Sequence, residues 1–149
     1  MIQDIIQDHF TAADQTAWDT GISALESIIQ ARLRNLDEDE NNKYGSIDEK
    51  NKLFVDKVDD YRNSQPTLSS GDIDWTEFKA DKFDRKFLET GAARLVALAK
   101  AMLETKRLHD FDNFQNALVD YHYTEYKNQT SPGLGYDTKY AELKQFFTT

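Results

Sequence analysis

The sequence has 149 residues and no cysteine, and its 27 acidic and 18 basic side chains give a formal net charge of −9 at pH 7. Without cysteine there is no disulfide framework, thiolate zinc site or cysteine nucleophile. The pI of about 4.7 argues against unaided binding to nucleic acid or to an anionic bilayer. No apolar run approaches the roughly 20 residues of a membrane span, and aromatic residues, at 12%, are too frequent for a disordered chain. We therefore expect a soluble, cytoplasmic protein with one domain over residues 1–149.

The first predicted helix follows an N-terminal segment at residues 1–10. Thr11 is a suitable N-cap, and Asp14 lies three residues later, where a negative charge is favourable at the positive end of a helix. Apolar residues then recur at steps of three and four, which is typical of one face of an α-helix. They are Trp18, Ile22, Leu25, Ile29, Leu33 and Leu36. Gly21, inside this helix, costs about 1 kcal/mol relative to alanine and leaves room for a close neighbour.

A second helix is predicted after an acidic loop at residues 37–45. Ser46–Glu49 has the spacing of a capping box, and the helix is expected to end before Pro66 because the residue preceding proline avoids helical angles. Its apolar residues are Leu53, Phe54, Val58 and Tyr61.

The longest predicted helix runs from about Trp75 to Leu108. At 1.5 Å per residue it is roughly 50 Å long, so we expect a kink or an end that projects past its neighbours. Its apolar face comprises Phe83, Phe87, Gly91, Leu95, Leu98 and Met102. His109–Asp110 marks a corner before a fourth helix, and a Pro/Gly loop at residues 130–136 precedes a short helix from about Asp137 to Phe147.

Together these elements predict an all-α fold, an antiparallel bundle of four long helices plus a short C-terminal helix. No segment alternates apolar and polar residues as a half-buried strand does. Short breaks between long amphipathic helices favour antiparallel neighbours.

The acidic loop is the first candidate for a metal site. With Asp37 as position one of an EF-hand-like loop, Asp39, Asn41 and Asp48 fall at positions three, five and twelve, where calcium takes oxygen ligands. The match is incomplete, because Asn42 replaces the glycine at position six and Asp48 is shorter than the usual glutamate. The alternative is a solvated acidic turn before the second helix.

The pair His122 and Glu125, spaced i, i+3, is the second metal candidate. Di-iron bundles use Glu-x-x-His in the reverse order, twice, with two further carboxylates. The chain has three histidines and no second such motif, so the alternative is a partly buried histidine bonded to a neighbour. A small enzyme would need a pocket in which His122, Asp120 or Glu125 has a strongly perturbed pKa.

The remaining acidic pairs carry no recognisable catalytic motif. Asp59–Asp60 and Asp110–Asp112 are typical of solvated faces or helix starts. Neither a nucleophile elbow nor a P-loop nor a dinucleotide fingerprint occurs. We therefore assign no catalytic residue, no cofactor-binding residue and no cofactor.

Tyrosines near the Pro/Gly loop are the candidates for a protein interface. They are Tyr123, Tyr126, Tyr136 and Tyr140. With Tyr121 they cannot all face one core, and exposed tyrosines bury area at interfaces at low entropic cost. The alternative is a tyrosine at the core boundary with its hydroxyl in water.

Three pieces of the sequence carry a family resemblance. Phe10–Asp14 opens the first helix, the helix with Phe54–Val55 ends near Pro66, and Asp120–Lys127 precedes Pro132–Leu134. In these pieces the chain resembles a group of uncharacterised short bacterial proteins that are all-helical by prediction. The resemblance implies a helical bundle and supplies no activity, cofactor or catalytic residue. The group's first loop is less acidic than Asp37–Glu40, which speaks against calcium binding as a shared role.

The function predicted from these observations is that of a non-enzymatic protein-interaction or structural module, with a protein partner or self-association. The competing hypothesis is a metal-binding helical protein, with calcium at residues 37–48 or a His/carboxylate site within the bundle.

Overall fold

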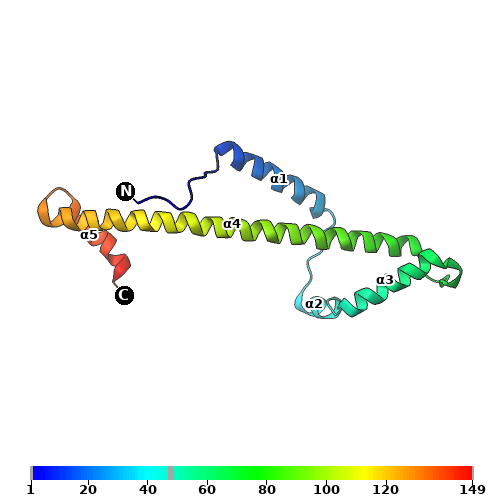
Figure 1. Cartoon of the computed structure of the whole chain (residues 1–149). Coiled ribbons are helices and arrows are strands. Elements are labelled where there is room, and N and C mark those ends of the chain that lie inside the picture. Colours follow the sequence, from blue (N-terminus) through cyan, green and yellow to red (C-terminus); the bar gives the residue numbers. More distant parts are fainter. Residues whose placement is uncertain (1, 47–48, 149) are drawn as a thin grey trace. The chain divides into compact units, whose positions relative to one another are not determined.

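The computed structural model describes residues 2–46 and 49–148, and within them every regular element is a helix (Figure 1). The elements in chain order are α1 (Ala12–Gln30), α2 (Glu38–Tyr44), α3 (Glu49–Ser64), the 3₁₀ turn η1 (Pro66–Leu68), α4 (Trp75–Thr130), α5 (Tyr136–Lys144) and the 3₁₀ turn η2 (Gln145–Phe147). The predicted all-α class is therefore confirmed for the described part of the chain.

Two compact units share these elements, although the sequence predicts one bundle domain. The first unit, Phe10–Ala92, contains α1, α2, α3 and the beginning of α4. The second unit consists of residues 1–9 and Ala93–Thr149, and contains the rest of α4 with α5. Each unit has its own polar and aromatic contacts.

Helix α1 begins where the sequence predicts but ends earlier. The Asp14 amide donates to Thr11 Oγ1 at 3.0 Å, and the Thr11 amide donates to Asp14 Oδ2 at 2.8 Å, so both halves of a capping box form. The helix ends at Gln30, and the prediction that it continues to Leu36 is wrong. After it the Arg32 amide donates to the Ile29 carbonyl at 2.8 Å in a turn, and the chain stays outside a helix up to Asp37, the extended N-cap of α2, with φ −76° and ψ 179°.

The segment predicted as an acidic loop is mostly helical. Asp37 Oδ1 accepts from the Glu40 amide at 2.8 Å and starts α2, a single short helix that ends at Tyr44. The Ser46 hydroxyl donates back to the Lys43 carbonyl at 3.1 Å, and the rest of the predicted capping box includes residues outside the described range. Helix α3 ends at Ser64, before Pro66, as predicted.

The corner predicted at His109–Asp110 is wrong, because the third and fourth predicted helices are one helix. Asp74 Oδ1 accepts from the Glu77 amide at 3.1 Å and caps α4, which then continues for 56 residues, about 84 Å at 1.5 Å per residue. Between Ala92 and Gln129 the sequence has no glycine or proline to end it. An i, i+4 ion pair of 2.7 Å from Lys106 to Asp110 spans the predicted corner.

The Pro/Gly loop ends α4 and starts α5 as the sequence predicts. Gly133 and Gly135 have φ values of +86° and +93°, in the region that side-chain-bearing residues rarely adopt. Helix α5 then begins at Tyr136 and ends at Lys144, before the predicted end at Phe147.

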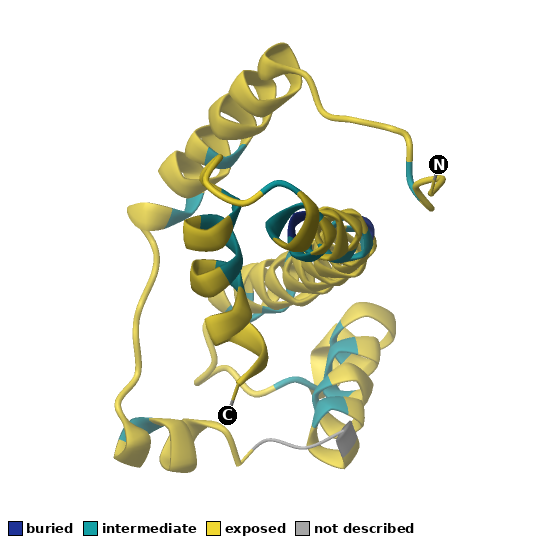
Figure 2. Cartoon of the chain, turned by 90° about the vertical axis from the view of Figure 1, so that its left-hand side faces the viewer, coloured by how far each residue is buried: buried dark blue, intermediate teal, exposed yellow. Residues whose placement is uncertain are grey.

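Apolar side chains are not buried in the described part of the chain. Figure 2 shows exposed ribbon over most of every helix, and the two buried residues, Asp112 and Thr124, are polar residues of α4. The Thr124 hydroxyl donates to the Asp120 carbonyl at 2.8 Å, so its burial leaves no unpaired group.

Candidate functional site

The predicted His122–Glu125 pair lies at the end of α4, opposite α5. His122 Nδ1 is 3.7 Å from Glu125 Oε2, and the Tyr140 hydroxyl donates to Glu125 Oε1 at 3.3 Å. Asp120 instead forms an ion pair of 2.6 Å with Lys139. The structure therefore brings Tyr140 to Glu125 and gives Asp120 a lysine, while most of the His122 side chain is in solvent.

An aromatic cluster joins α4 to the C-terminal helices. The Tyr121 ring stacks on Tyr140 at 5.7 Å with an interplanar angle of 16°, and lies 4.8 Å from the Phe147 ring. Desolvation within this cluster, followed by the hydrogen bond with Tyr140, raises the pKa of the Tyr121 hydroxyl. The cluster is held by offset and tilted ring contacts, which are typical of structural packing.

The four interface tyrosines divide into two pairs. Tyr136 and Tyr140 are half-buried against α4, and Tyr136 lies edge-on to Tyr123 at 6.2 Å. The hydrogen bond with Tyr136 raises the pKa of the Tyr123 hydroxyl. Tyr123 and Tyr126 remain exposed, Tyr126 by 61%, so that these two are the ones available to another protein.

The residues proposed for calcium are used by α2. Asp37 caps the helix, Asp39 lies in its first turn, and the side-chain Nδ2 of Asn41 donates to the Leu36 carbonyl at 3.1 Å. Asp48 lies outside the described residues. Over residues 2–46 and 49–148, no three histidine, aspartate or glutamate side chains converge as metal ligands.

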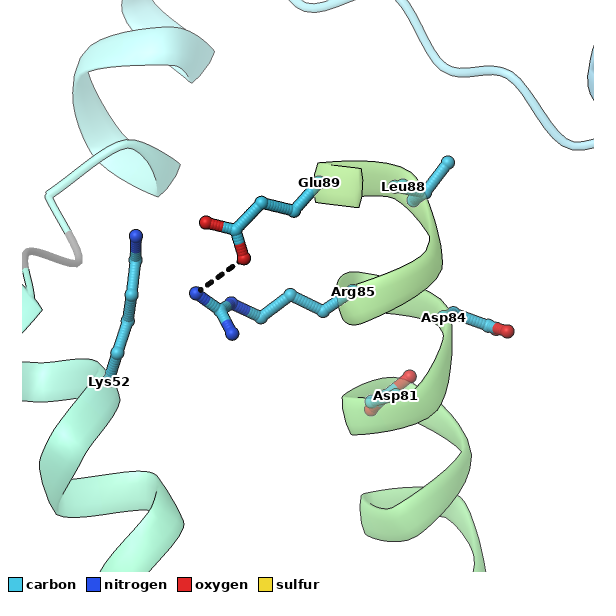
Figure 3. Close-up of a pocket in the computed structure, with 6 residues that line it drawn as sticks. All are labelled: Lys52, Asp81, Asp84, Arg85, Leu88 and Glu89. Atoms are coloured by element: carbon cyan, nitrogen blue, oxygen red, sulfur yellow. Dashed lines mark ion pairs between the residues drawn. The ribbon is translucent and has the colours of Figure 1, made fainter. Parts of the chain in front are cut away.

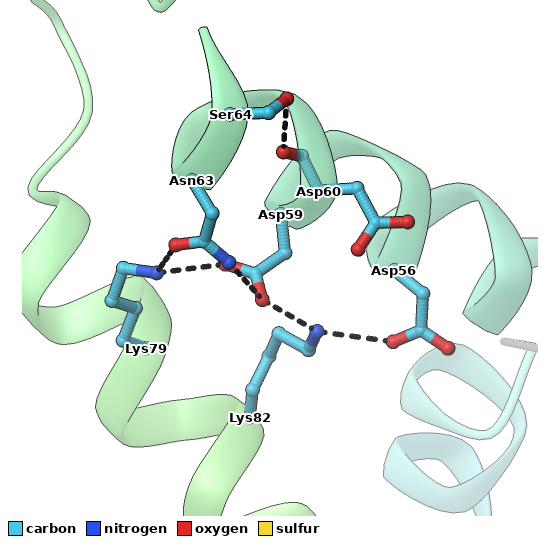
Figure 4. A network of polar contacts seen from close by, with 7 residues as sticks. All are labelled: Asp56, Asp59, Asp60, Asn63, Ser64, Lys79 and Lys82. Atoms are coloured by element: carbon cyan, nitrogen blue, oxygen red, sulfur yellow. Dashed lines mark hydrogen bonds and ion pairs between the residues drawn. The ribbon is translucent and has the colours of Figure 1, made fainter. Parts of the chain in front are cut away.

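Figure 4 shows a polar network between α3 and α4 that the sequence does not predict. Asp59 of α3 accepts from Lys79 at 3.1 Å and from Lys82 at 3.0 Å, both from α4, and Lys82 also pairs with Asp56 at 3.1 Å. Hydrogen bonds from Lys82 and then Lys79 lower the pKa of the Asp59 carboxyl. Asn63 accepts from Lys79 and donates to Asp59.

This network overturns the prediction that Asp59 is part of a solvated face. The available signal was the spacing: Asp56, Asp59 and Asn63 recur at three and four residues, as a helix face does, and Lys79 and Lys82 are three residues apart. The network joins α3 to α4.

Asp112, predicted to be solvated, is also a structural residue. Its side chain is only 7% exposed, and Oδ1 and Oδ2 accept from the Ile5 and Ile6 amides at 2.9 and 3.0 Å. These two hydrogen bonds lower the pKa of the carboxyl. Asn116 donates to Asp4 at 3.0 Å, so two side chains of α4 hold the segment at residues 4–6.

Two hollows lined by residues of the first unit do not resemble a catalytic pocket. An open depression of about 650 Å³ lies between α3 and α4, and in it Arg85 and Glu89 form an ion pair of 3.3 Å. Figure 3 shows the side chains that line it. Its lining residues are Lys52, Asp81, Asp84, Arg85, Leu88 and Glu89. A smaller groove of about 350 Å³ lies near Trp75, whose indole Nε1 donates to the Ser70 carbonyl at 2.9 Å. Neither lining contains a histidine or a nucleophile paired with a base.

Exposed apolar side chains on α4 are the most distinctive surface of the second unit. Leu95, Leu98 and Met102 are 42–50% exposed and follow at steps of three and four, on one face of the helix. A face of this kind stabilises a protein only when another surface removes it from water.

Comparison with known proteins gives no relative from which the role of this surface could be taken. No family model matches the chain, and neither a curated protein nor a solved structure matches it. Within the described residues, no helix is long and apolar enough to cross a bilayer.

Proposed function

We propose that the chain is a non-enzymatic helical interaction module that binds other protein, including copies of itself, through the apolar faces of its long helices. The observation that carries this proposal is the exposure of those faces: no apolar side chain of the described residues is buried, although 39% of the sequence is hydrophobic. Hydrophobic burial is the dominant favourable contribution to folding and to association.

The polar groups support a structural role. Asp59 is neutralised by lysines, Asp112 by backbone amides and Asp120 by Lys139. Each of these carboxylates joins one segment to α4. Such pairing fixes segments on the long helix and leaves its apolar face as the surface for binding.

The antiparallel packing of long helices that the sequence predicts is part of this proposal. Helix α4 provides a rod, and amphipathic helices laid along it bury the face that contains Leu98. The proposed setting is the cytoplasm, and the proposed partner is protein.

A dilution series with two readouts tests the proposal. Light scattering gives the mass, and the fluorescence of the dye 1-anilinonaphthalene-8-sulfonate (ANS) reports exposed apolar surface. We expect dye binding in dilute protein, and its loss when the chain associates or meets its partner. A 17.2 kDa monomer that binds no dye at any concentration would show that the faces are covered within the chain, and would refute the proposal.

A further inference from the structure

The charge of the sequence is unevenly distributed. Residues 1–49 contain eleven acidic and three basic residues, a net charge of −8 out of −9 for the whole chain. Within this segment α1 has Asp14, Asp19 and Glu26 and no lysine or arginine. The stretch Arg94–Arg107 of α4 has the opposite charge, with four basic residues and one acidic residue. An acidic helix and a basic helical stretch therefore occur in one sequence.

Complementary rows of side chains occur on these two stretches. On α1, the acidic row is Asp14, Trp18, Ile22 and Glu26; on α4, the basic row is Arg94, Leu98, Met102 and Lys106. Each row places two apolar residues between two charges at successive steps of four, which form one ridge on a helix surface. The two ends of each row are twelve residue steps apart, about 18 Å at 1.5 Å per step, so the charges at both ends can meet.

Most of both rows is exposed in the structure, with Ile22 half-buried. Trp18 is 42% exposed, and Leu98 and Met102 are each 50% exposed. Every hydrogen bond of α1 among the described residues is local to that helix and its caps. Glu26 and Arg94 form no ion pair in the described part of the chain, whereas Asp14 caps α1 and Lys106 pairs with Asp110.

We propose that α1 of one copy docks antiparallel on the basic row of α4 in a second copy. The antiparallel direction brings the two unpaired charges, Glu26 and Arg94, together, and brings Asp14 to Lys106. Because every chain has both rows, a twofold dimer makes the contact twice and packs four long helices, two α1 and two α4. Doubling the contact helps a pair of 19-residue helices reach the roughly 1,200–2,000 Å² that specific interfaces bury.

Gly21 gives independent support for a partner on α1. It lies three residues after Trp18 and four before Leu25, on the same face, and a Cβ built there meets nothing within 4 Å. Glycine inside a helix is unfavourable relative to alanine, and no neighbour in the described chain requires it. Close approach of the α4 backbone of a second copy accounts for the residue.

This inference rests on the proposed function, and charge reversal of the full chain tests it separately. Light-scattering mass over a dilution series gives the dimer dissociation constant. We expect Glu26→Lys and Arg94→Glu each to raise that constant about tenfold or more, because like charges then face each other in both symmetric contacts. The double variant restores the pair and returns the constant to near its original value. Glu142→Lys on α5 is the matched control, and leaves the constant unchanged.

Gly21→Ala separates docking from helix propensity. Propensity alone predicts a more stable helix and an unchanged or tighter dimer. If the α4 backbone of a second copy approaches closely here, circular dichroism should show a more helical α1 while the dimer becomes at least fivefold weaker. An unchanged or tighter dimer would contradict a close approach at Gly21.

Three outcomes would overturn the docking proposal. A mass of 17.2 kDa at every concentration would exclude the second copy, including the case in which α1 binds α4 of its own chain. A dimer unaffected by both single reversals, or one that the double variant does not restore, would place the contact elsewhere. The proposed interaction module is still supported if a chain that stays monomeric binds ANS. It is also supported if a dimer forms that does not depend on Glu26 and Arg94; in both cases only this docking arrangement fails.

Discussion

Helices α1 and α5 are both short compared with α4, yet they differ in what holds them. The nine-residue α5 is tied to α4 by the stack of Tyr140 on Tyr121 and by two polar contacts, to Glu125 and Asp120. The 19-residue α1 is twice as long, and its described hydrogen bonds are local. A periodic apolar face therefore predicts a helix, but specific contacts decide whether the helix packs within its own chain.

The turn before each helix explains part of this difference. Gly133 and Gly135, both at positive φ, reverse the chain directly after α4, so α5 returns to the helix it has just left. Helix α1 is separated from the beginning of α4 by more than forty residues and two other helices. Closing a longer loop costs more conformational entropy, which has to be repaid by contacts.

The largest effect is expected when the α5 contact is removed. Tyr140→Ala deletes the ring stack and the hydrogen bond to Glu125, and should lower the free energy of opening α5 by about 1.5 kcal/mol. Hydrogen exchange of the α5 amides measures this value. Tyr126→Ala, an exposed tyrosine of the same region, is the control and should leave those amides unchanged. Equal effects would mean that the stack does not hold α5.

The polar network between α3 and α4 should contribute less to the free energy of unfolding than its number of contacts suggests. Asp59→Asn removes the charge that Lys79 and Lys82 share, and should lower the free energy of unfolding by about 1 kcal/mol, since the lysines are partly exposed and solvent screens the pair. Urea denaturation monitored by circular dichroism measures the change. Asp60→Asn, whose carboxylate lies outside the network, is the control (Figure 4).

The pH dependence of the N-terminal segment tests the Asp112 contact. Because the folded-state pKa of Asp112 is lowered, its stabilisation is present above the unfolded value of about 3.9 and is lost as pH falls through the folded value. Protection of the Ile5 and Ile6 amides should therefore persist at pH 4 and be lost only as the pH falls further, through the lowered pKa of Asp112. Asp112→Asn should reduce that protection about fivefold at neutral pH, because one acceptor oxygen is replaced by an NH₂ group. Protection that does not respond to acid would contradict the contact.

Trp18→Ala should have a small effect in dilute protein. Because Trp18 is 42% exposed and the hydrogen bonds of α1 are local, we expect a change below about 0.5 kcal/mol in the free energy of unfolding. The same substitution should weaken the dimer at high concentration. A loss above 2 kcal/mol in the monomer would show that α1 is packed in its own chain, and would remove the contrast with α5.

Metal ions should have the smallest effect. A bound ion stabilises the native state by mass action, so added calcium or iron, or EDTA, should leave the melting temperature unchanged if α2 uses Asp37 as a cap. A higher melting temperature with calcium would instead support the predicted calcium site at residues 37–48, which includes Asp48.

Local chemistry made much of the fold predictable from the sequence. Thr11 with Asp14, Asp74 with Glu77, and the glycines after Thr130 all determine helix boundaries through neighbours within a few residues. The error at His109–Asp110 arose because both residues are compatible with a helix, and no proline lies within α4 to break it.

Contacts over long sequence distances were not predictable in the same way. Asp112 binds amides more than one hundred residues away, and nothing around it distinguishes it from a solvated aspartate such as Asp110. Asp59 shows the same problem, because its lysine partners are 20 and 23 residues further along the chain. The sequence predicts the four tyrosines as interface candidates together, and only the structure shows that Tyr136 and Tyr140 are half-buried while Tyr123 and Tyr126 are exposed.

Oxidative footprinting of Met102 tests the central claim, that the apolar face of α4 is open in one chain and covered by a second. Exposed methionine is oxidised to the sulfoxide readily, and a covered side chain is protected. The account predicts rapid modification of Met102 in dilute protein and progressive protection as concentration rises, with Arg94→Glu abolishing that protection. A Met102 that is equally protected at every concentration would show that its own chain covers the face, and would contradict the account.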